Sequence, residues 1–233
     1  MTRATMKVLG DVIVSPQDAW DDVNRRGQWI LPLVLLAIAT VAAWWLYYSR
    51  IDIVWLQDRL LVGTSELQGR ELALARDIMG PGLLALVTIG SSLIMGAMIM
   101  LLTAGYLHLV GRTLRVTHTG PSWLVFAAWL TVPETCALLL MAVRLTFGSN
   151  QQILPEAANP LSLSQLLDIA ADSPWLSLTG AIGVQSLWTL ALFTVGVSRW
   201  MKIGTVRAAL IAGLPPLLIY GTWALVIAVD AGA

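Results

Sequence analysis

The carboxyl group with the most unusual surroundings in this sequence is that of Glu134, which follows Pro133 in the run WLTVPETCALLL at positions 129–140. The rest of the run is almost wholly apolar, and an ionised carboxylate at the centre of a bilayer is costly. Two interpretations are open: a proton or ion relay or polar anchor for a partner, and a structural contact inside a helix bundle. We favour the structural contact and expect Glu134 to be neutral and to donate a hydrogen bond.

Three polar side chains in other apolar stretches are candidate partners for Glu134: Gln185, Ser186 and Tyr220. Polar side chains in membrane helices form hydrogen bonds across helix interfaces. We therefore expect these three residues to form an intramembrane polar centre with Pro133 and Glu134.

Prolines interrupt two of the apolar stretches, at Pro133 and at the pair Pro215 and Pro216. A proline in a helix lacks an N–H donor and frees the carbonyl four residues earlier, here that of Trp129 for Pro133. A carbonyl freed in lipid must find a donor inside the protein. We expect helix kinks at all three prolines, and we favour static kinks over a transporter site because the sequence shows no convincing internal repeat.

The sequence offers no constellation of catalytic residues. It contains no G-x-S-x-G, no His-Glu-x-x-His and no phosphate-binding loop. His108 and Cys136 have no second His or Cys at metal-ligand spacing. We expect no catalytic residue, no metal site and no cofactor, and therefore no enzyme.

Composition indicates an integral membrane protein. The 233 residues are 57% hydrophobic and 12% charged, whereas soluble domains are about 25% charged. The net charge is zero, so no global field attracts nucleic acid. We predict one all-α membrane domain over residues 1–233, with membrane lipid as its surroundings and no nucleic-acid partner.

The apolar stretches predict a bundle of five transmembrane helices, since a span needs about 20 apolar residues. The predicted spans are 29–48, 82–110, 123–145, 175–197 and 208–229.

Amphipathic segments outside the spans predict short interfacial helices. Residues 1–28 form a cytoplasmic segment whose helix should start at Ser15 and Pro16, an N-cap residue followed by proline at the first helical position. Residues 51–79 repeat their apolar positions at helical spacing, with a division into two helices at Gly63, Thr64 and Ser65.

The distribution of basic residues predicts the orientation. Nine Lys and Arg residues lie in the segments before span 1, between spans 2 and 3 and between spans 4 and 5, and five lie on the other side. Basic residues favour the cytoplasmic side. We predict a multi-pass protein of the cell inner membrane with a cytoplasmic N-terminus and a periplasmic C-terminus.

Several stretches resemble the Yip domain family of Ypt-interacting proteins, in the form that its bacterial members take. The resemblance covers nearly the whole chain and rests on SPQDAWDDV, on GRTLRVTHTGPSWLVFAAWLTVPETCALLL and on KIGTVRAALIAGLPPLLIYG. In addition, DIMGP is similar to the acidic-Leu-Tyr-Gly-Pro motif of eukaryotic members, with matches at Asp77, Gly80 and Pro81 and with Met79 in place of the tyrosine.

The resemblance implies a five-span, non-enzymatic membrane protein. Eukaryotic members bind small GTPases and act in vesicle traffic, a partner class that we do not expect to carry over to a bacterial chain. We predict a scaffold or accessory subunit that binds another membrane protein or organises the bilayer. The alternative is a small-solute or ion transporter or channel that uses Glu134.

A pair of small residues, Ser92 and Gly96, lies at four-residue spacing in the second span. Such a pair permits close contact between helices. It is compatible with homo-oligomer formation and equally with packing inside one molecule.

Overall fold

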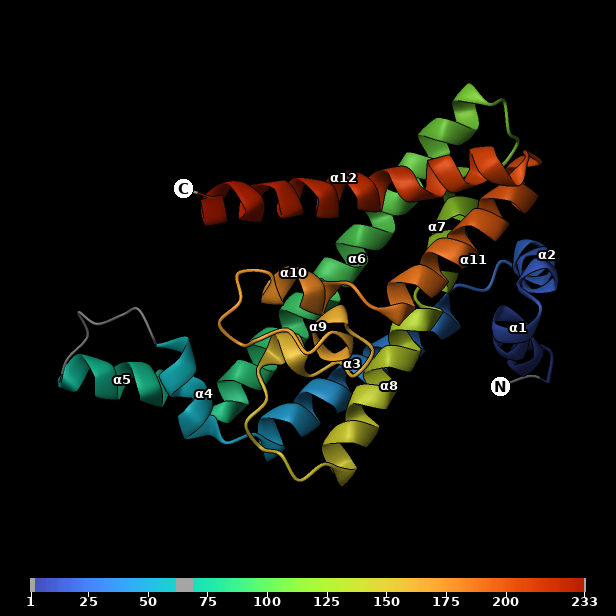
Figure 1. Ribbon diagram of the computed structural model, residues 1–233. Helices are drawn as coiled ribbons and strands as arrows, with labels where there is room; N and C mark the ends of the chain where they lie inside the picture. The colour runs from blue at the N-terminus through green and yellow to red at the C-terminus, as the bar shows by residue number, and fades with distance from the viewer. Residues whose placement is uncertain (1–2, 62–68, 233) are drawn as a thin grey trace.

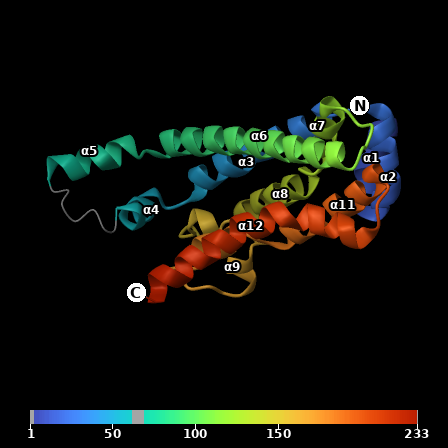
Figure 2. The same ribbon diagram turned by 90° about the horizontal axis from the view of Figure 1, so that it is seen from above.

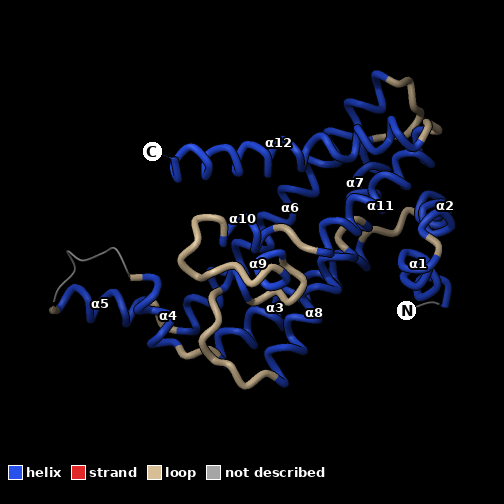
Figure 3. Tube along the Cα trace, viewed as in Figure 1, coloured by secondary structure: helices blue, strands red, loops and turns tan. Residues whose placement is uncertain are grey.

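The computed structural model describes residues 3–61 and 69–232, and these residues form helices joined by turns and loops, with no strand (Figure 3). The all-α class is therefore confirmed for the described residues. The helices in the first half of the chain are α1 (Arg3–Val14), α2 (Pro16–Arg26), α3 (Ile30–Arg50), α4 (Ile53–Leu60), α5 (Arg70–Ile78) and α6 (Pro81–Thr113). Those in the second half are α7 (Gly120–Trp129), α8 (Val132–Phe147), the 3-10 helix η1 (Pro155–Ala157), α9 (Leu163–Leu166), α10 (Leu176–Ala181), α11 (Val184–Met201) and α12 (Thr205–Gly232).

Four helical segments of the described chain are long and apolar enough to cross a membrane: α3, α6, α7 together with α8, and α12. They coincide with the first, second, third and fifth predicted spans. α6 has 33 residues, which corresponds to about 50 Å and exceeds the roughly 30 Å of a bilayer's hydrocarbon core. Figure 2 shows α6 and α12 on opposite sides of α8.

The fourth predicted span, 175–197, is not one helix. α10 ends at Ala181 and α11 begins at Val184, because Gly183 between them is extended and forms an isolated bridge with Ser162. The N–H of Val184 donates to the carbonyl of Leu161 at 3.0 Å. A long-range backbone contact thus replaces the helical hydrogen bonds at this point.

Next to Pro133, where we expect a kink, the helix is interrupted at Leu130 and Thr131, between α7 and α8. α7 ends at Trp129, and Pro133 lies in the first turn of α8, where a helix needs no N–H donor. The hydroxyl of Thr131 donates to the carbonyl of Ala128 at 2.8 Å, and the hydroxyl of Thr135 donates to that of Thr131 at 3.0 Å. The same two carbonyls also accept from the backbone N–H groups of Thr131 and Thr135, so the hydroxyls add second hydrogen bonds at this point. Pro215 and Pro216 differ, because α12 continues through them to Gly232.

An aromatic core holds the N-terminal segment against the bundle. Trp20 of α2 is 3% exposed and stacks on Phe126 of α7 with ring centroids 4.1 Å apart. Its indole N–H donates to the carbonyl of Leu192, and that of Trp200 donates to the carbonyl of Trp20. α2 begins at Pro16, as the sequence predicts, and it is packed between α7 and α11.

The connecting segments gather at two opposite ends of the molecule (Figure 1). At one end, Arg199 of α11 donates to Gln17 of α2 at 2.7 Å, and the ring of His118 lies 4.8 Å from that of Trp200. These contacts join the three segments that were assigned to the cytoplasm.

At the other end, the hydroxyl of Tyr47 donates to the carbonyl of Ile153 at 2.7 Å. The N–H of Asp52 donates to the carbonyl of Gln151 at 2.8 Å. Helices α4 and α5 follow from this end, and the division expected at Gly63, Thr64 and Ser65 lies outside the described residues.

The first prediction concerns Gly196, which faces the stacked pair of Trp20 and Phe126. A Cβ atom added at Gly196 would lie 2.5 Å from Phe126 and 2.6 Å from Trp20. Because overpacking a tight core costs about 1–3 kcal/mol, Gly196→Ala should lower the free energy of unfolding by that amount in detergent. Gly213→Ala is the control, since a Cβ there meets no atom within 4 Å. Equal stability of the two variants would contradict this packing.

The second prediction concerns orientation and follows from the two ends. Alkaline phosphatase is active only outside the cytoplasm, so a fusion at the C-terminus should be active and a fusion after Arg115 inactive. The reason is that Arg115 belongs to the basic end, with α2 and the α11–α12 turn, whereas the C-terminus of α12 points away from that end (Figure 1). An active fusion after Arg115 would reverse the assignment.

Candidate functional site

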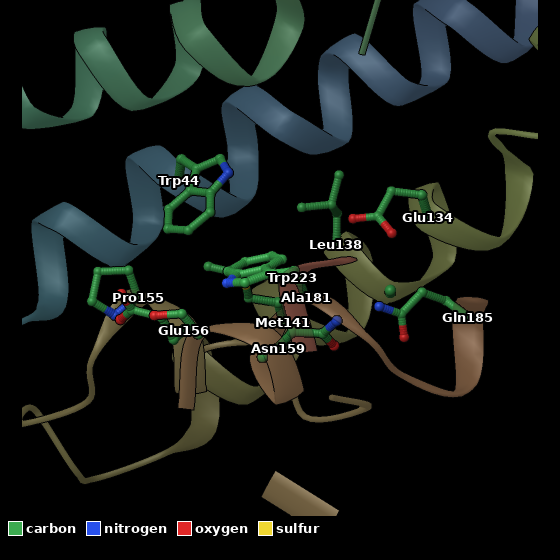
Figure 4. Close-up of a pocket in the computed structure, with 13 residues that line it drawn as sticks. Trp44, Glu134, Leu138, Met141, Pro155, Glu156, Asn159, Ala181, Gln185 and Trp223 are labelled. Carbon is green, nitrogen blue, oxygen red and sulfur yellow. The ribbon is translucent and has the colours of Figure 1, made fainter. Parts of the chain in front are cut away.

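A pocket of about 420 Å³ opens between α3, α8, α10, α12 and the loop around η1 (Figure 4). The volume lies within the usual range for small-molecule sites. Its polar and aromatic lining residues are Trp44, Glu134, Glu156, Asn159, Ser177, Gln185 and Trp223. The pocket therefore contains Glu134 and Gln185, two of the residues that the sequence singled out.

The break before α8 determines where Glu134 lies. Because α8 begins at Val132, Glu134 occupies its first turn, where the partial positive charge of a helix N-terminus stabilises a carboxylate. The residue is exposed and lines the open pocket. Among the described residues, none forms a hydrogen bond with its carboxyl group. The described residues therefore do not show the hydrogen bond that we expected the carboxyl group of Glu134 to donate.

The break before α11 places Gln185 in an equivalent position. Gln185 lies in the first turn of α11, is 5% exposed and lines the same pocket. Its Oε1 atom is buried and has no hydrogen-bond partner among the described residues. Such an atom loses its hydration without compensation, which costs about 1–3 kcal/mol.

The other predicted members of the polar centre lie apart from the pocket lining. Ser186 accepts a hydrogen bond from the N–H of Gly183 at 3.3 Å and so caps α11. Tyr220 is near enough to Glu134 for an electrostatic interaction. The structure therefore brings Glu134, Gln185 and Tyr220 into one region, with Pro133 beside it.

Sequence reasoning did not include the second wall of the pocket, which the loop at 148–174 supplies. The guanidinium of Arg144 donates to the carbonyl of Ala157 at 2.9 Å, and the hydroxyl of Ser164 donates to that of Glu156 at 3.2 Å. These bonds fix the loop so that Glu156 reaches the pocket. No local pattern marks this position, since the contacts are made with α8, α9 and α10.

The two tryptophans of the pocket lie far apart in the sequence. Trp44 lies near the end of a predicted span, where aromatic residues are common, and Trp223 lies deep in the last span. In the structure both line the pocket, from α3 and α12 respectively. The sequence alone does not show that α3 and α12 face the same loop, so it could not predict that both tryptophans line one pocket.

A metal ion has no evident site here. The described residues contain no group of three His, Cys, Asp or Glu side chains that could hold one. Cys136 is a free, half-buried thiol of α8. The pocket thus offers carboxylates, amides and indole rings for binding.

The family-like motif lies at the junction of α5 and α6, away from the pocket. Asp77 is in α5, Gly80 precedes α6, and Pro81 is its first residue. The side-chain amide of Gln57 donates to the carbonyls of Arg76 and Met79 at 2.9 and 3.0 Å. Gln57 therefore ties α4 to this junction.

Comparison with known proteins gives one match. The model of the family described as the Yip1 domain matches residues 10–226, which include the pocket lining and three of the four membrane-crossing segments and end within the fourth, α12. No curated protein and no solved structure matches the chain.

The third prediction compares two buried glutamines. Gln57 is 7% exposed and donates two hydrogen bonds, whereas the Oε1 atom of Gln185 has no partner in the described chain. Gln57→Met should therefore lower the free energy of unfolding by about 1–3 kcal/mol, and Gln185→Met should leave it unchanged or raise it. Thermal unfolding of the purified protein in detergent measures both. A comparable loss in the two variants would show that Gln185 has a stabilising role.

Proposed function

Since the chain belongs to the Yip1 domain family, a membrane-associated family not known as one of enzymes, we propose that it is a non-enzymatic scaffold or accessory subunit of the cell inner membrane. Its role is to bind another membrane protein or to organise the bilayer around it. In this proposal the bundle has five spans, with α11 as the fourth, the N-terminus in the cytoplasm and the C-terminus in the periplasm.

The exposed surface of α6 is the observation that carries this proposal. Only 6% of the most apolar window of α6 is buried inside the protein, against 61% for the segment that combines α7 and α8. A helix that served only the internal packing of a bundle would bury one face. α6 packs on α3 and α7 along one side, and its other side exposes large apolar residues, among them Leu86, Ile94 and Leu102, to lipid or to another helix.

The small-residue pair on α6 supports a helix as the occupant. A Cβ atom added at Gly96 would meet no atom within 4 Å, so Gly96 is not required for packing inside the described chain. Ser92 lies one turn earlier on the same face. Small residues at this spacing let a second backbone approach closely, and we therefore place a transmembrane helix of the partner, or of a second copy of this chain, on this face.

The pocket supports a second candidate function, the binding or transport of a small solute or ion. It is open, it contains Glu134, and its volume suits a small ligand. Transport also requires access from both sides of the membrane, whereas binding alone requires only the pocket.

The fourth prediction tests the α6 interface by photo-crosslinking in cells. Benzoylphenylalanine at Ser92 should give a protein adduct of defined mass, and the same probe at Ile94 should give little. Ile94 is 72% exposed and lies about 200° around the helix from Ser92. An adduct of twice the chain's mass would identify a second copy as the partner, and any other defined mass would identify a different protein.

Two glycine variants provide the matched control for this experiment. Gly96→Leu should abolish the Ser92 adduct because it fills the close-approach surface. Gly90→Leu should not, since Gly90 also faces open space but lies on another side of α6. Equal crosslinking at Ser92 and Ile94, or adducts with lipid alone, would refute a specific interface on α6.

A further inference from the structure

We propose that one end of the molecule binds the headgroup of an anionic phospholipid, on a surface formed by the α6–α7 loop, the α11–α12 turn and the helix ends beside them. This basic surface carries Arg112, Arg115, Arg199, Lys202 and Arg207. The inference goes beyond the scaffold role, since a protein of either candidate function could bind such a lipid. The basic surface also lies about 30 Å along α6 from Ser92, so its test and the crosslinking test can fail independently.

The five cations of the basic surface have no carboxylate near them in the sequence. No Asp or Glu occurs in residues 78–133 or in residues 173–229, and these two ranges contain all five. All five residues are exposed. None of them forms an ion pair within the described chain, and Arg199 donates to the neutral side chain of Gln17. Their counter-charge must therefore come from outside this part of the protein.

The N-terminal segment at the same end differs, because its basic residues are compensated. Lys7 lies 3.8 Å from Asp11, and Arg25 and Arg26 both pair with Asp22. The orientation of a membrane protein depends on the number of Lys and Arg residues and little on Asp and Glu. Orientation alone therefore does not explain why the other two segments lack carboxylates, and the excess positive charge of this end is concentrated on the basic surface.

The two connections that form the basic surface lie close together. The ring of His118 is 4.8 Å from that of Trp200. The hydroxyl of Tyr106, in the last two turns of α6, donates to the carbonyl of Ile211, in the first two turns of α12, at 2.9 Å. Figures 1 and 2 show the end of α6 and the start of α12 at the end of the molecule where α2 lies. One headgroup region can therefore meet cations from both connections.

Exposed apolar side chains place the basic surface at the level of lipid headgroups. The membrane-crossing segments Pro81–Thr113 and Thr205–Asp230 each have an arginine near this end, Arg112 and Arg207. Leu114 and Val206 beside them are large apolar residues that are also exposed. Basic side chains near the end of a span extend their charge toward the headgroups while their neighbours stay in lipid. A soluble polyanion would leave these apolar side chains in water.

Two residues of the basic surface adopt a backbone conformation that favours glycine. The φ angle is 57° at Arg115 and 53° at Lys202. Lys202 ends α11, a position where glycine is the usual residue in this conformation because other L-residues lose free energy there. The chain nevertheless has a basic side chain at both positions, and both are exposed, so packing does not require them. Backbone strain that packing does not explain is expected at functional sites.

A hollow of about 500 Å³ at the α11–α12 turn gives room for a headgroup. Residues 202–207 line it, and Lys202 and Arg207 are the charged residues among them. Lysine and arginine are the side chains that pair with phosphate oxygens. A phosphatidylglycerol headgroup carries only the negative charge of its phosphate, whereas phosphatidylcholine adds a cation that would meet the same positive charges. The basic surface should therefore select the anionic lipid.

The fifth prediction tests this selection by native mass spectrometry of the full-length protein with equal amounts of phosphatidylglycerol and phosphatidylcholine of the same acyl chains. The wild type should retain phosphatidylglycerol in preference. Arg115→Gly and Lys202→Gly should each weaken its retention about fivefold, the effect expected for one basic residue at an anionic membrane surface. Lys7→Ala is the matched control, because it removes one positive charge from the same end, at a residue that pairs with Asp11; it should retain the lipid as the wild type does.

Glycine is chosen in these variants because it adopts a positive φ without strain. The melting temperature of Arg115→Gly and of Lys202→Gly in lipid-free detergent should therefore not fall. A variant that keeps its melting temperature and loses phosphatidylglycerol separates loss of the lipid contact from loss of the fold. If a glycine variant is destabilised, Arg115→Gln and Lys202→Gln remove the same charges and should show the same loss of lipid.

Free phosphate is distinguished from a lipid headgroup by competition. Inorganic phosphate at the concentration of the lipid should not displace phosphatidylglycerol, because it lacks the acyl chains that hold the headgroup at this level. Displacement would assign a site for free phosphate and overturn the lipid proposal. Equal retention of the two lipids by the wild type, or a loss in Lys7→Ala as large as in Arg115→Gly and Lys202→Gly, would overturn it as well.

Discussion

The structure depends on how two helix breaks satisfy their backbone groups inside an apolar bundle. At the first break, between α7 and α8, the hydroxyls of Thr131 and Thr135 donate to backbone carbonyls. At the second, between α10 and α11, the N–H of Val184 donates to the carbonyl of Leu161. Backbone groups in a membrane must be paired within the protein, and these hydrogen bonds supply part of that pairing at each break.

Each break also creates a helix N-terminus, and a polar residue of the pocket lies in the first turn that follows. Glu134 follows the break before α8, and Gln185 follows the break before α11. The loop held by Arg144 then closes the opposite wall with Glu156. The pocket is thus a consequence of interrupting two helices and of anchoring one loop to α8.

The parts of the fold that the sequence predicts are those controlled by local composition. Four spans follow from hydropathy alone, and Pro16 marks the start of α2. The interruption at Gly183 depends on Leu161, more than twenty residues earlier, and Glu156 reaches the pocket through contacts with three separate helices. Such pairings depend on how distant segments pack, so spacing within one segment does not reveal them.

The two polar residues that the sequence did identify, Glu134 and Gln185, illustrate why local rules fail at functional sites. Gln185, Ser186 and Arg199 make α11 more polar than the other long helices, and α11 is not among the segments that qualify as spans by length and composition. α11 nevertheless packs along α12 and α8 and runs from the middle of the molecule to the end where α2 lies (Figure 1). The amide of Gln185 lowers the mean hydropathy of α11, which makes insertion of this helix into the membrane less favourable. Because its Oε1 atom has no partner in the described chain, the amide also lowers the stability of the fold. Departures from local rules are expected at functional or strained sites, and the polar first turn of α11 is such a departure.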